Sequence, residues 1–129
     1  MTEEHIALAR RAVVCKGWRW MPGMRWVNDP AKPLTSEGDE GRHEYGYTPP
    51  KYGIPDLTDP ATLGCLLALV REAWGCAVVT SPDYDYDDEE ARQGETVTGW
   101  RAVETVRWMT VGEGVTEAEA LVVALEAAP

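Results

Sequence analysis

Residues 59–75 read DPATLGCLLALVREAWG, and this stretch is the strongest helix signal in the chain. Asp59 can cap a helix, and Pro60 suits the first helical position because its missing N–H needs no partner there. Gly75 is typical of a helix end. The apolar residues extend nearly all the way round the helix, which predicts burial on more than one side. The expected core-facing stripe is Leu63, Leu66, Leu67, Val70 and Trp74.

Two further helices are predicted, one near each end of the chain. Residues 3–15 repeat apolar residues at helical spacing, acidic residues lead the segment, and Gly17 suits its end. The last helix is expected to begin at Thr116, whose spacing to Glu119 is that of a capping box. Its expected buried residues are Ala120, Leu121, Ala124 and Leu125.

Strands are predicted between these helices. Residues 76–81 form a short apolar run, and residues 97–111 alternate between apolar and polar. Glu104 interrupts the apolar side of that alternation, so we expect a bend, bulge or short turn near Glu104 and Thr105. Nearer the N-terminus, residues 18–21 and 24–27 flank a Pro-Gly pair, which is typical of a strand or short hairpin. The apolar side of residues 97–111 holds Trp100, Ala102, Val106 and Trp108.

Residues 28–56 contain many prolines, glycines and polar residues without sustained periodicity, and they predict a long irregular loop. The whole order favours an α/β (α+β) fold class, in which about three helices cover a small, mostly antiparallel sheet. A chain of 129 residues is expected to form a single domain over residues 1–129.

Charge is distributed unevenly along the chain. The 22 acidic and 12 basic residues give a formal net charge of −10. Residues 1–32 hold six basic and three acidic residues, a net of +3, so the remainder carries −13. A chain this acidic is repelled by duplex nucleic acid and by anionic membranes, and we expect it to bind neither directly. The three cysteines lack metal-type spacing, so reduced thiols are expected, and no metal or cofactor.

Catalytic motifs are missing from the sequence. The two histidines, His5 and His43, stand in an expected helical turn and in the expected long loop. No nucleophile or metal-ligand spacing accompanies either of them. We therefore expect a binding protein and not an enzyme.

Several segments together resemble a known family. A helix followed by GW and a Trp-rich extended segment, then YGIPDLTDPATLGCLLALVREAW, an acidic hairpin loop and a closing TEAEALVVALEA helix are similar to the phage α-β-α (ABA) sandwich domain family. The resemblance covers nearly the whole chain. It implies a small phage or prophage protein located in the cytoplasm of the bacterial host cell, and it brings no catalytic residues with it. Residues 24–47 lie outside the resemblance.

The first candidate site is an acidic loop. Carboxylates at this spacing can imitate the phosphates of nucleic acid, and interleaved tyrosines add contact surface to the charge. A calcium loop is not indicated, because the sixth position from Asp83 is Asp88 instead of Gly. A solvated hairpin tip is the alternative interpretation. The candidate partner-binding residues are Asp83, Tyr84, Asp85, Tyr86, Asp87, Asp88, Glu89 and Glu90.

The second candidate site surrounds residues 17–26, which read GWRWMPGMRW. Arginines can pair with an anion while an aromatic ring stacks on a base. The alternative is that the tryptophans belong to the core and the arginines extend to solvent. The candidate ligand-binding residues are Arg10, Arg11, Lys16, Arg19, Arg25, Trp26, Tyr45 and Tyr47.

These sites predict function by stoichiometric binding. The leading expectation is inhibition of a host antiviral defence protein, in the manner of an anti-CRISPR protein, through the acidic surface. The first alternative is a sponge that sequesters a small nucleotide immune signal in the basic, aromatic site. The second alternative is a structural accessory of the virion. Open sheet edges also favour a homodimer or a higher homo-oligomer.

Overall fold

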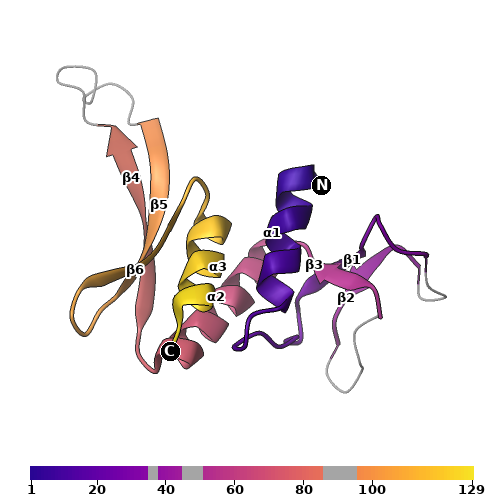
Figure 1. Cartoon of the computed structure of the whole chain (residues 1–129), viewed down its shortest axis with the longest axis horizontal. Coiled ribbons are helices and arrows are strands. Elements are labelled where there is room, and N and C mark those ends of the chain that lie inside the picture. Colours follow the sequence, from indigo (N-terminus) through magenta and orange to yellow (C-terminus); the bar gives the residue numbers. More distant parts are fainter. Residues whose placement is uncertain (35–37, 45–50, 86–95) are drawn as a thin grey trace. The chain divides into compact units, whose positions relative to one another are not determined.

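The computed structural model describes residues 1–34, 38–44, 51–85 and 96–129 (Figure 1). Helices and antiparallel strands alternate along the described chain, which confirms the predicted α+β class. The elements are α1 (Glu3–Val13), β1 (Arg25–Asn28), β2 (Glu40–Arg42), β3 (Gly53–Pro55), α2 (Pro60–Trp74), β4 (Val78–Asp85), β5 (Thr96–Glu104), β6 (Met109–Gly114) and α3 (Glu117–Ala127).

The chain divides into two compact units, and the boundary falls within α2. The first unit is Met1–Leu69 and the second is Val70–Pro129. Each unit has its own three-stranded sheet, so the strands form two sheets where one was expected. The expectation of a single domain stays a prediction.

In the first unit, β1 is the central strand of the sheet, with β2 and β3 on either side. Trp26 on β1 stands opposite Gly41 on β2 and is 7% exposed. A Cβ atom added at Gly41 would lie 2.7 Å from the Trp26 ring, so the glycine leaves room for the indole. Helix α1 packs on β3 and buries Leu8, Ala9 and Ala12.

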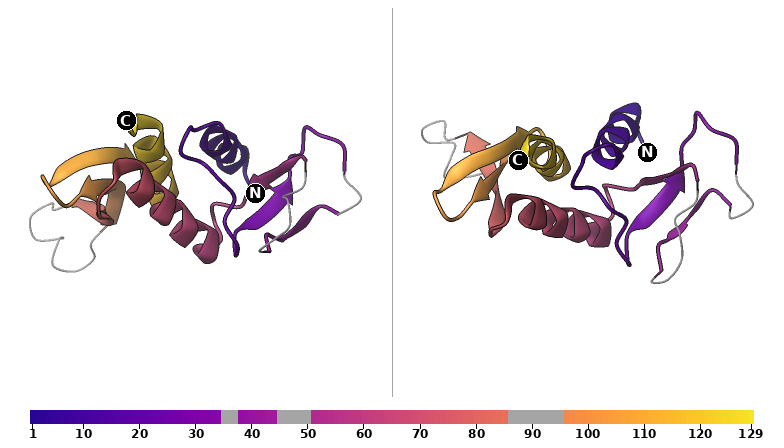
Figure 2. Two further views of the ribbon diagram at one scale, coloured as in Figure 1. Left: turned by 90° about the horizontal axis from the view of Figure 1, so that it is seen from below. Right: turned by 60° about the horizontal axis from the view of Figure 1, so that its bottom comes forward.

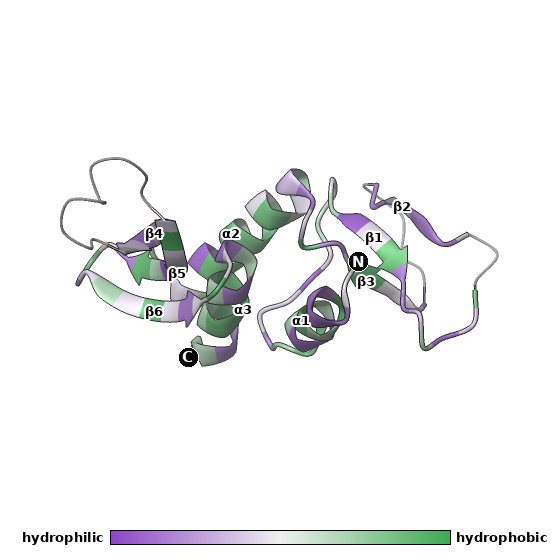
Figure 3. Cartoon of the chain, turned by 90° about the horizontal axis from the view of Figure 1, so that it is seen from above, coloured by the Kyte–Doolittle hydropathy of each residue, from purple (hydrophilic) through white to green (hydrophobic). Residues whose placement is uncertain are grey.

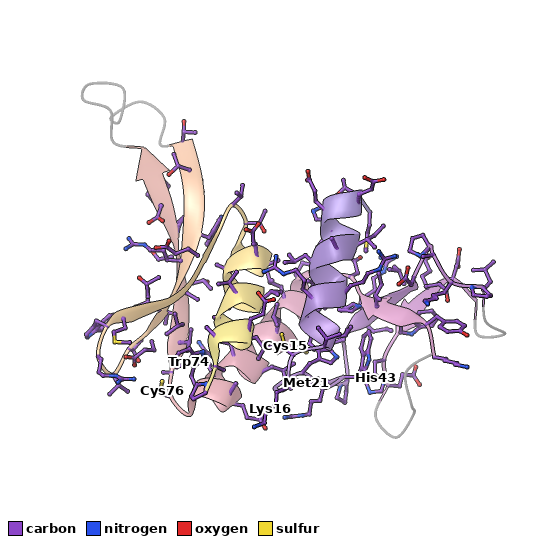
Figure 4. All side chains as sticks on the ribbon, in the orientation of Figure 1. Cys15, Lys16, Met21, His43, Trp74 and Cys76 are labelled. Carbon is purple, nitrogen blue, oxygen red and sulfur yellow. The ribbon has the colours of Figure 1, made fainter. Side chains whose placement is uncertain are left out.

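The second unit is a meander in which β5 lies between β4 and β6. Helix α3 packs across this sheet, and its residues are apolar over most of its length (Figures 2 and 3). A Cβ atom added at Gly112 on β6 would overlap the Ala120 carbonyl oxygen and lie 2.6 Å from the Ala124 nitrogen. The glycine therefore permits the close approach of helix and strand. The indole N–H of Trp74 donates to the Ala124 carbonyl at 2.8 Å (Figure 4).

The predicted helix starts are confirmed by their capping contacts. The Asp59 carboxylate accepts the N–H of Thr62 at 3.0 Å, and the Thr116 hydroxyl accepts the N–H of Glu119 at 3.1 Å. Gly75, just after α2, has a φ of +68°, the left-handed conformation typical of a helix end. Helix α1 ends at Val13, two residues before the predicted end.

The predicted strands need three corrections. Residues 18–21 form no strand, and β1 pairs with β2 and β3 in place of the expected hairpin. The expected loop 28–56 contains both of those short strands. The expected stretch 97–111 is two strands, β5 and β6, because the bend, bulge or short turn expected near Glu104 is a turn that reverses the chain. That turn places Val106 and Trp108 in solvent and not on a buried face.

Among the described residues, the helices are too short or too polar to cross a membrane.

Candidate functional site

The acidic charge of the chain is concentrated in the second unit. Residues 70–129 hold four basic and 13 acidic residues, a net of −9, whereas residues 1–69 hold eight and nine, a net of −1. Dividing the sequence at residue 32 does not show that the acidic charge belongs to one unit. It makes the second unit the strongest source of electrostatic potential in the molecule.

The predicted acidic loop is only partly within the described residues. Asp83 and Tyr84 belong to β4, beyond the predicted strand end at residue 81, and Asp85 is the last residue of that strand. The Asp83 carboxylate pairs with the Arg101 guanidinium on β5 at 2.8 Å. The remaining candidates of this loop, Tyr86, Asp87, Asp88, Glu89 and Glu90, lie outside the described residues.

A buried carboxylate organises the turn between β5 and β6. The Glu104 side chain is 1% exposed and accepts the backbone N–H groups of Val106 and Arg107 at 3.0 and 3.1 Å. The Arg107 guanidinium adds a contact at 3.2 Å. Burial alone would raise the Glu104 pKa, but these hydrogen bonds together hold that pKa below its ordinary value. Glu104 is therefore an ionised structural residue.

The outer side of the same turn is fixed as well. The backbone N–H and the hydroxyl of Thr105 both donate to the Ala77 carbonyl, at 3.0 and 3.2 Å. Trp108 closes the turn with a φ of +56°, a conformation that bulky residues rarely adopt. Its side chain is 73% exposed, and the neighbouring side chains of Val106 and Met109 are 72% and 44% exposed. The turn thus presents three apolar side chains to solvent.

Two arginines face each other across the first sheet. Arg25 on β1 is directly opposite Arg42 on β2, and together with Glu40 and Gly41 they line an open pocket of about 260 Å³. Like charges at directly opposed positions repel each other. A pocket lined by two guanidinium groups is chemically suited to an anion, provided that those groups are available.

Carboxylates already occupy both guanidinium groups. Arg42 makes two contacts with Asp59, at 2.9 and 3.1 Å, and this pairing holds the pKa of Asp59 well below its usual range. Arg25 pairs with Glu40 and lies 3.6 Å from the Asp56 carboxylate. Two arginines against three carboxylates leave this cluster with a net charge of −1. An incoming anion must therefore displace a carboxylate from its arginine.

Two of the other predicted ligand-binding residues, Arg10 and Trp26, have structural contacts instead. Arg10 pairs with Asp29 through two hydrogen bonds, which tie α1 to the turn after β1. Trp26 is buried against Gly41, so the expectation that it stacks on a ligand is not supported. The side chains of Arg11, Lys16 and Arg19 are exposed. Tyr45 and Tyr47 lie outside the described residues.

The first two tryptophans of the GWRWMPGMRW segment contact each other. The rings of Trp18 and Trp20 are perpendicular, with centroids 5.5 Å apart, and His43 lies 6.3 Å from Trp20. Both indoles are half-buried. They do not line the arginine pocket, and they lie on no strand, so the interpretation of these tryptophans as core residues stays a prediction.

In the described ranges, no group of three or more His, Cys, Asp or Glu side chains could hold a metal ion. The three cysteines are free and half-buried. Burial, and then the negative charge of Glu104, raises the pKa of the Cys76 thiol, which lies 3.8 Å from that carboxylate. This thiol is thus a poor nucleophile.

Sequence reasoning missed the roles of Glu104, Trp108 and Arg42. The break in the alternating pattern at Glu104 indicated a bend, bulge or short turn. The sequence did not show that this acid is buried and holds the turn. Arg42 carried no such signal, because its partner Asp59 is 17 residues away in sequence.

Compared with protein-family models, curated proteins and solved structures, the chain matches none of them.

Proposed function

We propose that this chain is a non-catalytic phage or prophage protein that inhibits a host antiviral defence protein. Its acidic second unit occupies a positively charged surface that normally holds nucleic acid. The net charge of −9 on residues 70–129 carries the proposal. That charge is dense enough to steer the molecule toward a basic groove and to compete with phosphate for its lysines and arginines.

The identity of the partner class follows from this chemistry and from the phage resemblance. Nucleic-acid-guided nucleases hold RNA and DNA in positively charged channels, and a stoichiometric protein inhibitor needs only to fill such a channel. The host cytoplasm is the compartment in which this contact would occur.

A plaque assay tests this function. Bacteria with CRISPR immunity against a phage should become sensitive again when they express the chain. Replacing Asp85, Asp87, Asp88, Glu89 and Glu90 by their amides should restore immunity. A matched variant with Glu3, Glu4, Glu37, Asp39 and Glu44 replaced should remain inhibitory, because the second unit keeps its charge. Equal loss in both variants would contradict the proposal, as would full activity of the first.

The opposed arginines favour a second candidate function, which is sequestration of a small nucleotide signal. A phosphate could replace Glu40 beside Arg25, since the Glu40 side chain is 60% exposed and can move into solvent. Native mass spectrometry of purified protein should then show a nucleotide-sized adduct, and Arg25→Ala should remove it. The net negative charge around the arginines is the reason this function ranks second.

A further inference from the structure

The turn between β5 and β6 combines features that rarely occur together. It exposes Val106, Trp108 and Met109, while the carboxylate of Glu104 holds its backbone from inside. In Figure 1 the turn lies at the end of the hairpin, on the side away from α3. Single exposed apolar residues are common, but here three of them stand at one turn. We call residues 105–109 the apolar tip.

The backbone at Trp108 is strained in a position where the side chain gains no burial. A φ of +56° suits glycine or asparagine, and a bulky side chain there is disfavoured. Packing does not explain the tryptophan, because 73% of it is in solvent. Residues held in strained backbone conformations cluster at functional positions.

We infer that the apolar tip is the anchor of a protein interface, and that its partner is a positively charged protein surface with an apolar pocket for Trp108. The inference rests on the proposed function and deepens it by naming the contact that supplies affinity. Tryptophan is enriched among the residues that dominate interface energies. Because Glu104 and Ala77 hold the turn from two sides, little conformational freedom is lost on binding.

Charge complementarity favours a positively charged partner protein over a second copy of the chain. The apolar tip belongs to the unit with a net charge of −9, and its own cation, Arg107, is paired with Glu104. Two such units repel each other, whereas a basic surface is attracted to the unit that carries the apolar tip. Charge would bring the partner in, and the tryptophan would fix its position.

Two labelled peptides of equal charge test the inference by fluorescence anisotropy. In one peptide, lysine is the only charged or bulky residue. In the other peptide, leucines alternate with lysines. The wild-type chain should bind the leucine-containing peptide roughly tenfold more tightly, as expected for a tryptophan anchor. Trp108→Gly should remove this preference and leave the affinity for the lysine peptide unchanged.

Matched variants separate the apolar tip from general apolar exposure and from loss of fold. Val115→Ser removes an equally exposed apolar residue of the same unit and should keep the preference. Neither Trp108→Gly nor Trp108→Asn should lower the melting temperature, because both residues accept the left-handed backbone. A lower melting temperature would show that Trp108 is structural and overturn the inference.

The remaining outcomes distinguish the two proposals. Equal affinity for both peptides, or a preference that survives Trp108→Gly, overturns the apolar tip as an anchor and leaves the acidic surface intact. Failure to bind the lysine peptide contradicts the proposed function itself. If sedimentation shows a wild-type dimer and Trp108→Gly dissociates it, the partner of the apolar tip is a second copy of the chain. That result also overturns the inference.

Discussion

At the scale of single residues, carboxylates with fixed partners hold the local structure together. Glu104 holds a turn, Asp59 caps α2 and pairs with Arg42, and Asp29 pairs with Arg10. The pKa of each of these three carboxyl groups lies below its ordinary value. For Asp29 and Asp59 the main cause is the hydrogen bond from the paired arginine. The sequence shows that these residues are acidic, but their roles depend on contacts that form only in the fold.

Glu104→Ala should lower the free energy of unfolding by about 2 kcal/mol, because it leaves the N–H groups of Val106 and Arg107 without their acceptor. Urea unfolding followed by circular dichroism measures this change. Glu113→Ala, at an exposed position on β6, serves as the control and should change stability by less than about 0.5 kcal/mol. Equal effects of the two substitutions would show that Glu104 does not organise the turn.

Stability should fall as the pH decreases below about 4. Asp29, Asp59 and Glu104 have lowered pKa values in the folded state, so the unfolded chain takes up protons first. Their contribution is complete above the ordinary carboxyl pKa and is lost as the pH falls through the folded values. Arg42→Gln should lower stability slightly at pH 7, and this difference from wild type should shrink on acidification. Urea titrations at several pH values measure it, and a difference that grows at low pH would contradict this assignment.

At the scale of elements, the sequence predicted the helices well because their signals are local. Caps at Asp59 and Thr116 and a glycine after α2 lie within a few residues of the features they control. The strands β2 and β3 are three residues long in glycine- and proline-rich surroundings, so they leave no periodic pattern. The hairpin of β5 and β6 was predicted only in part. The break at Glu104 indicated a bend, bulge or short turn, but Trp108 continues the apolar alternation although it faces solvent.

Gly112→Ala should destabilise the second unit by about 3 kcal/mol, since the added methyl group meets the backbone of α3. Gly64→Ala is the opposite case. Gly64 is exposed within α2, nothing lies within 4 Å of its added Cβ atom, and alanine should raise stability by up to about 1 kcal/mol. Thermal unfolding of both variants tests the pair. A harmless Gly112→Ala would show that α3 does not approach β6 this closely.

At the scale of the whole molecule, the two units differ more in net charge than in fold. Both units contain a three-stranded antiparallel sheet, but one is nearly neutral and the other carries −9. The acidic balance could be read from composition. Its assignment to one unit required the structure, because the unit boundary falls inside an uninterrupted helix.

Displacement of DNA from a purified RNA-guided effector complex tests the central claim most directly. Fluorescence anisotropy of a labelled target duplex should fall as the wild-type chain is added. The variant neutralised at Asp85, Asp87, Asp88, Glu89 and Glu90 should require at least about tenfold more protein, because electrostatic competition with phosphate is weakened. The variant neutralised at Glu3, Glu4, Glu37, Asp39 and Glu44 has the same net charge of −5 and should match the wild type. Equal displacement by the two variants would contradict the claim that the second unit acts by occupying a nucleic-acid site. Failure of the wild-type chain and both variants to displace the DNA would contradict it as well.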